Sequence, residues 1–513
     1  MTSRPRLVHE FLEQSADRLP AKVALVCDDR RLSYQDLNDA ANRLAQALVG
    51  QGVGRGDRVV LYLTNSVELV VGIFAVLKAG AVFVVLNPTA KHDKVDYIAR
   101  NCQAAALMTG AAHLELLRGL LSSLPSLRVG ILTQATEPQP AGAGIWRYED
   151  LLARYPNHRP QRDIIDRDLA CLIYTSGSTG DPKGVMSDHS NVVFAVESIT
   201  SYLHNVEDDV VIDVLPLSFD YGLYQLLMTF SFGGRLVLER GFAYPSQILE
   251  RMEAERVTGF PGVPTLYSVL LEMDLSGFNL ASLRYLSNTA AALPPAHIRR
   301  LTAKFPGVQV FSMYGLTETK RTLYLPVDQL EKRPDSVGIA IPGTEVWLED
   351  ERGNRLGSGE VGELVVRGRH VMRGYWGDEA ATQRRYHPGP LPGELVCHTG
   401  DLFRKDEEGY FYFVGRTDDI IKSRGEKVSP KEVEDVIYRL EGVREAAVIG
   451  VPDPVLGEAI QAFVVPNEKG LTPDEVLRHC RSHLEDYMVP RRVEIRSELP
   501  KTGSGKIKKS GLR

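Results

Sequence analysis

Cysteine is scarce in this sequence and never occurs in a spacing that binds zinc or forms a redox pair. The chain has 513 residues and five cysteines (Cys27, Cys102, Cys171, Cys397 and Cys480), with no Cys-x-x-Cys pair among them. This pattern excludes a disulfide-stapled scaffold and a cysteine-based metal site. We interpret the five as buried or incidental thiols in a reducing compartment, and we expect a cytoplasmic protein.

Long apolar runs and an excess of one charge are also missing. The first 20 residues alternate apolar and charged side chains at helical spacing, and no window of about 18 apolar residues follows. The chain carries 60 basic and 66 acidic residues, a net charge of −6. We therefore expect no membrane span, no secretion signal and no nucleic-acid partner. The sequence leaves the oligomeric state open.

The sequence does contain a long alternation of helical and strand patterns. At roughly 150 residues per domain, the length predicts about three structural units. Residues 37–49 are typical of a helix, residues 58–63 of a strand and residues 67–77 of a second helix. This order favours an α/β architecture with a largely parallel sheet. Further strands are expected at 210–214, 235–238 and 307–311.

Two smaller units are expected to follow. From Glu345 the pattern changes to short strands separated by glycine turns, which predicts a small antiparallel or barrel-like β subdomain. After Asp418, the order helix, strand, strand, helix predicts a compact α+β unit at 430–440, 445–451, 459–465 and 472–484. We therefore predict the fold class α/β, with an N-terminal domain over 1–417 and a small mobile C-terminal domain over 418–513. Its basic, glycine-rich tail is also expected to be mobile.

The sharpest local motif is the loop from Tyr174 to Gly184. It holds four Ser or Thr hydroxyls, three glycines and a lysine in eleven residues, and it follows an apolar strand at 169–173. Backbone N–H groups, hydroxyls and a cation together suit phosphate oxygens. The loop is not a Walker motif, because Pro182 precedes its lysine and Gly184 follows it. On composition alone, a Ser/Gly-rich surface loop is the competing interpretation.

Several motifs in a fixed order resemble the adenylate-forming superfamily, which comprises acyl- and aryl-CoA synthetases, nonribosomal-peptide adenylation domains and beetle luciferases. The resemblance extends over essentially the whole chain. Besides the Tyr174–Gly184 loop, the motifs are Leu77-Lys-Ala-Gly80-Ala, Tyr314-Gly-Leu-Thr-Glu318, Gly374-Tyr-Trp376, Thr399-Gly-Asp401, Gly415-Arg-Thr-Asp-Asp-Ile-Ile-Lys422, Gly425-Glu-Lys-Val-Ser-Pro-Lys-Glu-Val-Glu434 and Pro500-Lys-Thr-Gly-Ser-Gly-Lys506.

The resemblance implies a two-step ligase that uses ATP and Mg²⁺. A carboxylate attacks the α-phosphate of ATP, and pyrophosphate leaves. The thiol of CoA, or of phosphopantetheine on a discrete acyl or peptidyl carrier protein, then displaces AMP from the acyl-adenylate. Such phosphate chemistry requires donors, a cation and a metal on the transferring oxygens. In this resemblance Thr317 touches the α-phosphate, Glu318 ligates Mg²⁺ and Lys506 is the catalytic lysine that bridges the carboxylate and the α-phosphate.

The resemblance also assigns the nucleotide site. It implies that Tyr314 stacks on adenine, that Asp401 accepts the two ribose hydroxyls, and that Arg416 lies beside it on the ribose or a phosphate. Asp418 resembles the hinge about which the C-terminal domain rotates between the two half-reactions. The implied ligands of the β- and γ-phosphates are Thr175, Ser176, Gly177, Ser178, Thr179, Gly180 and Lys183.

The acyl pocket carries the information about the substrate. By resemblance it is lined from the segments 215–224, 260–263, 288–291 and 313–321. Its candidate residues are Phe219, Asp220, Tyr221, Tyr224, Ala290, Ala291, Met313 and Arg321. Small residues at 222, 290 and 291 are expected to leave room, whereas the tyrosines narrow the cavity, which favours a short or ring-shaped acid.

Asp220 divides two hypotheses, because a carboxylate in an acyl pocket requires a cation. If Arg321 supplies it, the substrate is a neutral small acyl or aryl acid, which we favour. If the substrate's own ammonium supplies it, the protein is a stand-alone amino-acid adenylating enzyme, for example for proline, that loads a peptidyl carrier protein. A luciferase-like oxidase is a remote alternative. A non-catalytic scaffold would be expected to lack Lys506, Glu318 or Asp401, and all three are present.

Overall fold

The computed structural model describes residues 4–135, 144–161, 163–176, 181–417, 419–423, 426–453, 457–467, 470–502 and 505–512. The chain packs into two compact units. Unit 1 comprises residues 1–261, 317–320 and 368–395, and unit 2 comprises residues 262–316, 321–367 and 396–513. Both units therefore contain segments that lie far apart in the sequence.

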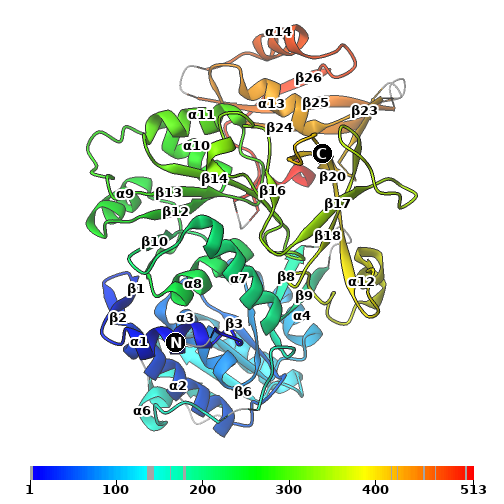
Figure 1. The fold of residues 1–513 in the computed structure, drawn as a ribbon. Coiled ribbons are helices and arrows are strands. Elements are labelled where there is room, and N and C mark those ends of the chain that lie inside the picture. Colours follow the sequence, from blue (N-terminus) through cyan, green and yellow to red (C-terminus); the bar gives the residue numbers. More distant parts are fainter. Residues whose placement is uncertain are drawn as a thin grey trace. The chain divides into compact units, whose positions relative to one another are not determined.

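Unit 1 is built on parallel strands with helices between them, as the alternation predicts (Figure 1). One sheet has the order β7-β6-β5-β3-β4-β8-β9 and is parallel except for the β8–β9 hairpin. Its strands are β3 (Arg58–Tyr62), β4 (Val82–Val85), β5 (Ala106–Gly110), β6 (Val129–Thr133), β7 (Ile145–Arg147), β8 (Leu169–Ser176) and β9 (Pro182–Asp188).

A second group of strands in unit 1 has the order β2-β1-β11-β10-β12 and is parallel apart from the β1–β2 pair. These strands are β1 (Val23–Cys27), β2 (Arg30–Ser33), β10 (Val210–Asp213), β11 (Arg235–Leu238) and β12 (Gly259–Gly262), and β19 (Tyr386–Pro388) follows later in the chain. The helices of unit 1 are α1 (Glu10–Arg18), α2 (Tyr34–Gly50), α3 (Val67–Lys78), α4 (His92–Asn101), α5 (Leu114–Ser123), α6 (Tyr148–Arg154), α7 (His189–Leu203), α8 (Asp220–Phe232), α9 (Pro245–Ala254) and α12 (Glu379–Arg385).

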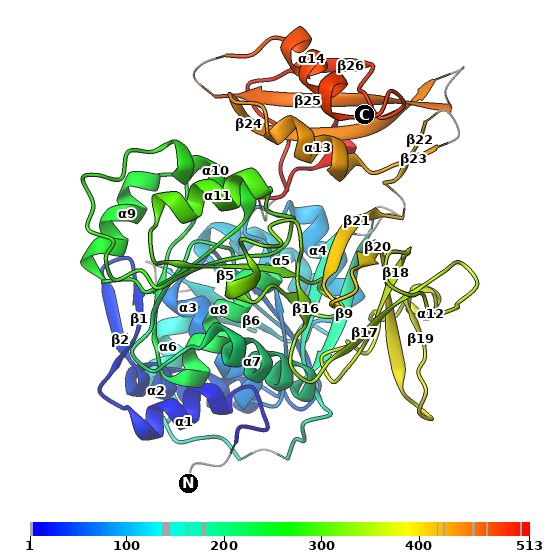
Figure 2. The same ribbon diagram turned by 45° about the horizontal axis from the view of Figure 1, so that its top comes forward.

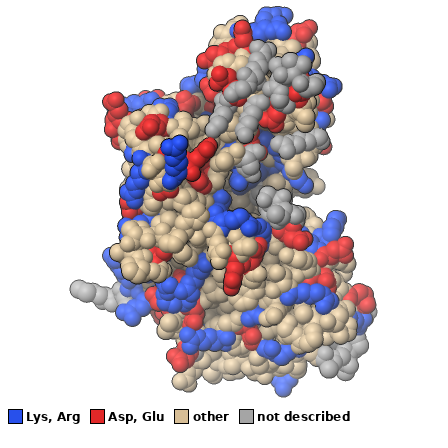
Figure 3. Space-filling model, turned by 90° about the vertical axis from the view of Figure 1, so that its right-hand side faces the viewer, with Lys and Arg blue, Asp and Glu red and all other residues tan. Residues whose placement is uncertain are grey.

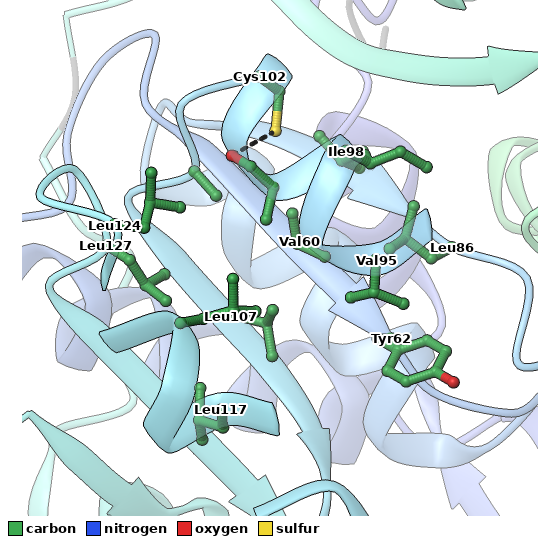
Figure 4. Close-up of a cluster of buried hydrophobic side chains, with 14 of the residues drawn as sticks. Val60, Tyr62, Leu86, Val95, Ile98, Cys102, Leu107, Leu117, Leu124 and Leu127 are labelled. Carbon is green, nitrogen blue, oxygen red and sulfur yellow. Dashed lines mark hydrogen bonds between the residues drawn. The ribbon is translucent and has the colours of Figure 1, made fainter. Parts of the chain in front are cut away.

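Helices α4 and α5 cover one face of the parallel sheet and bury its apolar side chains. In Figure 4, Val95 from α4 and Leu117 from α5 lie with Val60 and Leu107, which belong to β3 and β5. All four are completely buried. Removing such side chains from water is the main stabilisation of a layered α/β fold.

A buried lysine ties the first three helices together. Lys78, at the end of α3, has no exposed surface and lies 2.8 Å from Glu13 Oε1, Asn38 Oδ1 and Asn42 Oδ1. These residues belong to α1 and α2. An ammonium group has three N–H donors, so the three acceptors satisfy it fully. The lysine of the Leu77–Gly80 motif therefore joins helices in this structure.

Unit 2 begins with a short mixed sheet. Strands β13 (Tyr285–Asn288) and β14 (Gln309–Tyr314) are parallel, and β15 (Leu323–Tyr324) and β16 (Ile339–Ala340) add antiparallel pairs. Helices α10 (Pro264–Glu272) and α11 (Pro295–Lys304) accompany them. The antiparallel β subdomain expected from Glu345 onward is confirmed as β17 (Glu345–Glu349), β18 (Val361–Arg367), β20 (Leu395–Lys405) and β21 (Phe411–Arg416).

The C-terminal part of unit 2 is an α+β layer, as its pattern predicts. Strands β22 to β26 form one sheet, and α13 and α14 pack on it (Figure 2). On the other side of the strands, Leu499 and Leu512 pack against Phe463. The elements are β22 (Ile421–Ser423), β23 (Glu426–Val428), α13 (Pro430–Tyr438), β24 (Val443–Asp453), β25 (Gly457–Pro466), α14 (Pro473–His483) and β26 (Arg492–Ile495).

Packing divides the chain differently from the expected boundary at residue 417. The C-terminal layer belongs to unit 2 together with residues 262–316, 321–367 and 396–417. The expected hinge, Asp418, lies outside the described residues. The division into 1–417 and 418–513 rests on rotation during the reaction and stays a prediction.

The structure also shows where the cysteines and the surface charges lie. All five cysteines are buried, and burial raises the pKa of the Cys27 and Cys102 thiols to about 12, so these two stay protonated. None of the helices that the structure describes is both long and apolar enough to cross a membrane. On the face shown in Figure 3, basic and acidic side chains are interspersed over the surface, in agreement with the small net charge.

Candidate active site

The predicted phosphate-binding segment Tyr174–Gly184 contributes residues to both strands of the β8–β9 hairpin. In the antiparallel register Thr175 lies opposite Lys183, and Ser176 lies opposite Pro182. The strand β9 begins at Pro182, which agrees with the extended backbone that a proline imposes on its neighbourhood. Gly177, Ser178, Thr179 and Gly180 lie outside the described residues, as does the side chain of Ser176.

The segment Gly374–Trp376 pairs with β9 and carries a tyrosine to the loop lysine. Met186 N donates to Gly374 O at 2.9 Å, and Trp376 N donates to Gly184 O at 2.8 Å. This pairing places Lys183 Nζ 5.7 Å from the centroid of the Tyr375 ring and 3.8 Å from Asp378 Oδ2. A cation over an aromatic face is attracted by the ring's electrons, so Tyr375 helps to orient Lys183.

The same tyrosine reaches the expected metal ligand. Tyr375 Oη donates a hydrogen bond of 2.6 Å to Glu318 Oε1, and Met372 N donates to Glu318 O at 3.0 Å. Glu318 is almost buried, and Thr317 precedes it. Unit 1 thus brings together three motifs that lie far apart in the sequence. The sequence analysis named Tyr375 only as part of a motif, and its proximity to Glu318 was not predicted.

Glu318 fits a magnesium ion that arrives with a phosphate ligand. Among the described residues, no group of three or more His, Cys, Asp or Glu side chains is placed to hold a metal. Mg²⁺ is usually bound by one or two carboxylates together with substrate phosphates and water. The hydrogen bond from Tyr375 uses Oε1. One oriented carboxylate beside a phosphate loop is therefore a suitable donor set.

A second cluster lies in unit 2, around Asp401. Tyr314 Oη donates a hydrogen bond of 2.6 Å to Asp401 Oδ2, and Arg416 Nη1 lies 3.8 Å from Asp401 Oδ1. Asp401 on β20 and Arg416 on β21 are cross-strand neighbours in the register. The expected nucleotide residues Tyr314, Asp401 and Arg416 are thus adjacent, with a nearly buried carboxylate between two donors.

The backbone around Asp401 is fixed by its own motif. Gly400 has a φ of +68°, and its N–H donates to Glu363 Oε1 at 2.7 Å. A left-handed backbone conformation favours glycine, which explains the glycine of the Thr-Gly-Asp motif. Asp401 N donates to Thr399 Oγ1 at 3.2 Å. The ring of Tyr314 packs edge-on against Phe403 at 4.8 Å between centroids.

Four predicted acyl-pocket residues lie at the start of α8 in unit 1. Asp220 is the first residue of the helix, Phe219 is its N-cap, and Tyr221 and Tyr224 are buried within it. The rings of Phe219 and Tyr221 meet edge-on at 6.4 Å. The predicted residues are therefore grouped on one helical turn.

Asp220 forms an ion pair with a residue that the sequence analysis did not consider. Lys320 Nζ lies 2.9 Å from Asp220 Oδ1, and the two side chains are 0% and 6% exposed. The same Nζ lies 5.7 Å from the centroid of Tyr224. Lys320 has a φ of +56°, a conformation that non-glycine residues rarely adopt. The only signal in the sequence was a second basic residue directly before Arg321.

The structure explains the glycine at position 222 by a reason other than the one expected. A Cβ at this position would lie 2.6 Å from Pro216 O and 3.0 Å from Leu215 O. The space beside Gly222 is therefore filled by backbone, so this glycine permits close packing of α8 on the preceding loop. The expectation that Gly222 leaves room for substrate is not supported by this geometry.

The other predicted acyl-pocket residues belong to unit 2. Met313 and Arg321 are buried, Ala290 has a φ of +77°, and Ala291 is exposed. Asn288 Nδ2 donates to Ala291 O at 3.0 Å, which fixes the turn after β13. Asp220 belongs to unit 1 and Arg321 to unit 2, and the pairing expected between them stays a prediction.

Lys506 follows a tight turn in the C-terminal tail. Thr502 N donates to Lys506 O at 2.7 Å, and Lys506 N donates to Thr502 Oγ1 at 3.1 Å. Two neighbouring lysines form ion pairs, Lys501 with Glu445 and Lys509 with Glu434, each at 2.7 Å. The described residues of this tail are thus held by β24 and α13, whereas the sequence predicts a mobile tail.

Comparison with known proteins agrees with this arrangement. Residues 12–376 match the family model of the AMP-binding enzymes, and residues 432–506 match the AMP-binding enzyme C-terminal domain. The long-chain-fatty-acid–CoA ligase of Bacillus subtilis is 31% identical, with 98% of this chain and 93% of the relative covered. Feruloyl-CoA synthase of an Amycolatopsis species is 34% identical over 94% of this chain and 93% of its own.

A solved structure shows the same fold. The anthranilate–CoA ligase AuaEII in complex with anthranoyl-AMP superposes with a TM-score of 0.91 at 28% identity, covering 99% of this chain and 97% of its own. Family model, relatives and structure agree with the resemblance that the motifs indicated. The chain therefore belongs to the AMP-binding, adenylate-forming enzymes and is an AMP-forming ligase that joins a carboxylic acid to a thiol.

Proposed function

We propose that this enzyme activates an acyl or aryl acid without an α-ammonium group and transfers it to CoA. The observation that carries the proposal is the buried pair of Asp220 and Lys320, at 2.9 Å. An amino-acid substrate needs an anion for its ammonium, but this carboxylate already has a buried cation within the protein. Displacing Lys320 would leave a fully buried ammonium unpaired, which is costly.

Three of the related enzymes are named for acids without an α-ammonium group. Their names specify a long-chain fatty acid, ferulate and anthranilate, and each is described as a CoA ligase or synthase. The buried rings of Tyr221 and Tyr224 beside Asp220 favour a short or ring-shaped acid over a long chain. We therefore infer a small aryl or acyl acid and CoA as the thiol.

In the first half-reaction, the proposed roles follow from charge. Lys183 and the Thr175 backbone lie at the phosphate turn, where a cation and N–H donors bind the β- and γ-phosphates. Asp401 accepts the ribose hydroxyls, and Lys506 brings the substrate carboxylate to the α-phosphate. Mg²⁺, when bound, neutralises phosphate charge, and Glu318 would hold it. The carboxylate oxygen bonds to the α-phosphorus as the bond to pyrophosphate breaks.

In the second half-reaction, the thiol of CoA releases its proton to solvent, its sulfur attacks the acyl carbon, and AMP leaves with the electrons of the C–O bond. We propose that rotation at Asp418 removes Lys506 from the site before this step, because one small domain serves both reactions. Asp401 keeps the nucleotide in place through both steps. Products are the thioester, AMP and pyrophosphate.

The test is acid-dependent exchange of labelled pyrophosphate into ATP, with a panel of aryl, short aliphatic, long aliphatic and amino acids. Each active acid is then incubated with ATP and CoA, and the thioester is identified by mass spectrometry. We expect exchange with aryl or short acyl acids and a CoA thioester as product. Exchange with amino acids alone, with transfer only to a carrier protein, would contradict the proposal.

A further inference from the structure

The described residues next to Lys506 are hydrogen-bonded to one another. Its backbone is closed by Gly505 N donating to Thr502 O at 2.9 Å, besides the two bonds between Thr502 and Lys506. Lys501 forms an isolated antiparallel bridge with Ile507, and its side chain is anchored on Glu445. Lys506 is therefore tied to Thr502, and its neighbour Ile507 to Lys501, so a contact at Gly505 acts directly beside Lys506.

Such a contact is made by Thr265, in the first turn of α10. Thr265 Oγ1 donates a hydrogen bond of 3.0 Å to the carbonyl oxygen of Gly505, the residue directly before Lys506. Gly505 has a φ of +80°, and a Cβ there would lie 3.2 Å from Val263 Cγ2 and 3.4 Å from Thr265 Oγ1. The Gly505 backbone therefore lies directly against residues 263–265.

The direction of this hydroxyl is unusual for a helix. Ser and Thr within helices commonly donate to the carbonyl one turn earlier. Ser268 on the same helix does this, since its Oγ donates to Pro264 O at 2.9 Å. The Thr265 hydroxyl instead reaches a residue 240 positions away.

A second contact joins the same parts of unit 2. The ring of His297 on α11 meets the ring of Tyr438 on α13 edge-on, at 5.2 Å between centroids. Figures 1 and 2 both show α10 and α11 next to the strand β24 and helix α13. The Thr265 bond is therefore part of a wider contact between residues 264–304 and the C-terminal layer.

We propose that Thr265 is a positioning residue for adenylation, which holds the Lys506 turn by its hydrogen bond to Gly505 O. The inference rests on the proposed role of Lys506 in the first half-reaction. Thr265 does not touch the reacting atoms in this scheme. It acts through the turn, and the bond must break when the C-terminal domain rotates for thioester formation.

The test compares Thr265→Val, which keeps the shape and removes the hydroxyl, with Thr265→Ser, which restores it. Losing one neutral hydrogen bond should lower kcat of acid-dependent pyrophosphate exchange by about threefold to tenfold. The KM values for ATP and acid should stay within twofold of wild type. Thioester formation from supplied acyl-adenylate and CoA should also stay within twofold, and Thr265→Ser should recover exchange.

The matched control is Thr302→Val on α11, whose hydroxyl donates to Ile298 O at 2.9 Å within its own helix. It should leave both half-reactions unchanged. Lys506→Ala and the double variant Lys506→Ala/Thr265→Val test whether Thr265 acts through Lys506 or independently of it. If Thr265 acts only through the turn, the double variant exchanges no more slowly than Lys506→Ala.

Three outcomes overturn the inference in distinguishable ways. If Lys506→Ala retains exchange, the proposed role of Lys506 is wrong, and the positioning role is lost with it. If Lys506→Ala loses exchange but Thr265→Val does not, the proposed function stands and only the role of Thr265 is wrong. Equal loss in both half-reactions of Thr265→Val, without rescue by Thr265→Ser, identifies a purely structural residue.

Discussion

At the scale of single residues, the proposed substrate class rests on the buried ion pair of Asp220 and Lys320. Asp220→Asn should destabilise the protein by about 3–5 kcal/mol, because it leaves a fully buried ammonium without its carboxylate. Asp220→Asn/Lys320→Met should recover most of that loss, and Asp220→Asn/Arg321→Met should recover less. The free energies of unfolding of the wild type, the single variant and the two double variants are compared by denaturant unfolding. Better recovery with the Arg321 double variant would identify Arg321 as the dominant partner.

A second prediction at this scale concerns Tyr375, which should orient Glu318 for Mg²⁺ binding. Tyr375→Phe removes the hydrogen bond to Glu318 and keeps the ring beside Lys183. Because a bond to a charged group is stronger than a neutral one, we expect roughly a tenfold or larger loss of exchange at low Mg²⁺ and partial recovery at high Mg²⁺. Exchange measured across a Mg²⁺ titration checks this.

The control for that experiment is Tyr386→Phe, whose ring packs 6.0 Å from Tyr375. It should show the wild-type Mg²⁺ dependence. If Tyr375→Phe also shows the wild-type dependence, Tyr375 does not orient the carboxylate.

Residue identity at the site was only partly predictable. Tyr314, Asp401 and Arg416 were named from motifs, and the structure brings them together. Lys320 could not be chosen as a partner of Asp220, because two cations follow each other in the sequence and the contact depends on the local backbone conformation. That conformation, a positive φ at a lysine, leaves no sign in the sequence.

At the scale of elements, close packing of α8 gives the next prediction. Gly222→Ala would place a Cβ 2.6 Å from Pro216 O, and backbone does not move aside easily. We expect destabilisation by about 1–3 kcal/mol and a lower Tm. Gly119→Ala in α5 is the matched control, because its Cβ would meet nothing within 4 Å. That variant should be neutral or more stable by up to about 1 kcal/mol. Equal Tm values for both variants would show that the α8 contact can relax.

Helices and strands were largely predictable because hydrophobic periodicity is a local property. The strand expected at 235–238 is β11, and the helix expected at 67–77 is α3 with one further residue. The helix expected from Leu37 begins at Tyr34, since Ser33 and Asp36 form a capping box. The hairpin β8–β9 was expected as a loop, because its pairing depends on residues after the turn.

At the scale of the whole molecule, the two half-reactions should respond differently to changes in the C-terminal part. Lys506→Ala should lower adenylation by roughly 10²-fold or more, the effect of removing one preorganised electrostatic contact, and leave thioester formation from supplied acyl-adenylate largely intact. Equal losses in the two steps would argue against alternating use of the domain.

Asp418→Pro should give the complementary result. Proline fixes φ near roughly −65° and should restrict rotation of residues 419–513, so exchange should survive better than thioester formation. Wild-type overall turnover of this variant would show that rotation at Asp418 is unnecessary. The boundary at residue 417 comes from motifs and stays a prediction, whereas packing groups the C-terminal layer with other segments of unit 2.

The central claim is that this ligase activates a carboxylic acid that carries no α-ammonium group. The most direct measurement is pyrophosphate exchange by the wild-type enzyme with pairs of acids that differ only in that group, such as 3-phenylpropanoate and phenylalanine, or cyclopentanecarboxylate and proline. Because Asp220 already binds Lys320, we predict a higher kcat/KM for the ammonium-free member of each active pair. A higher kcat/KM for the amino acid in every active pair would contradict the claim.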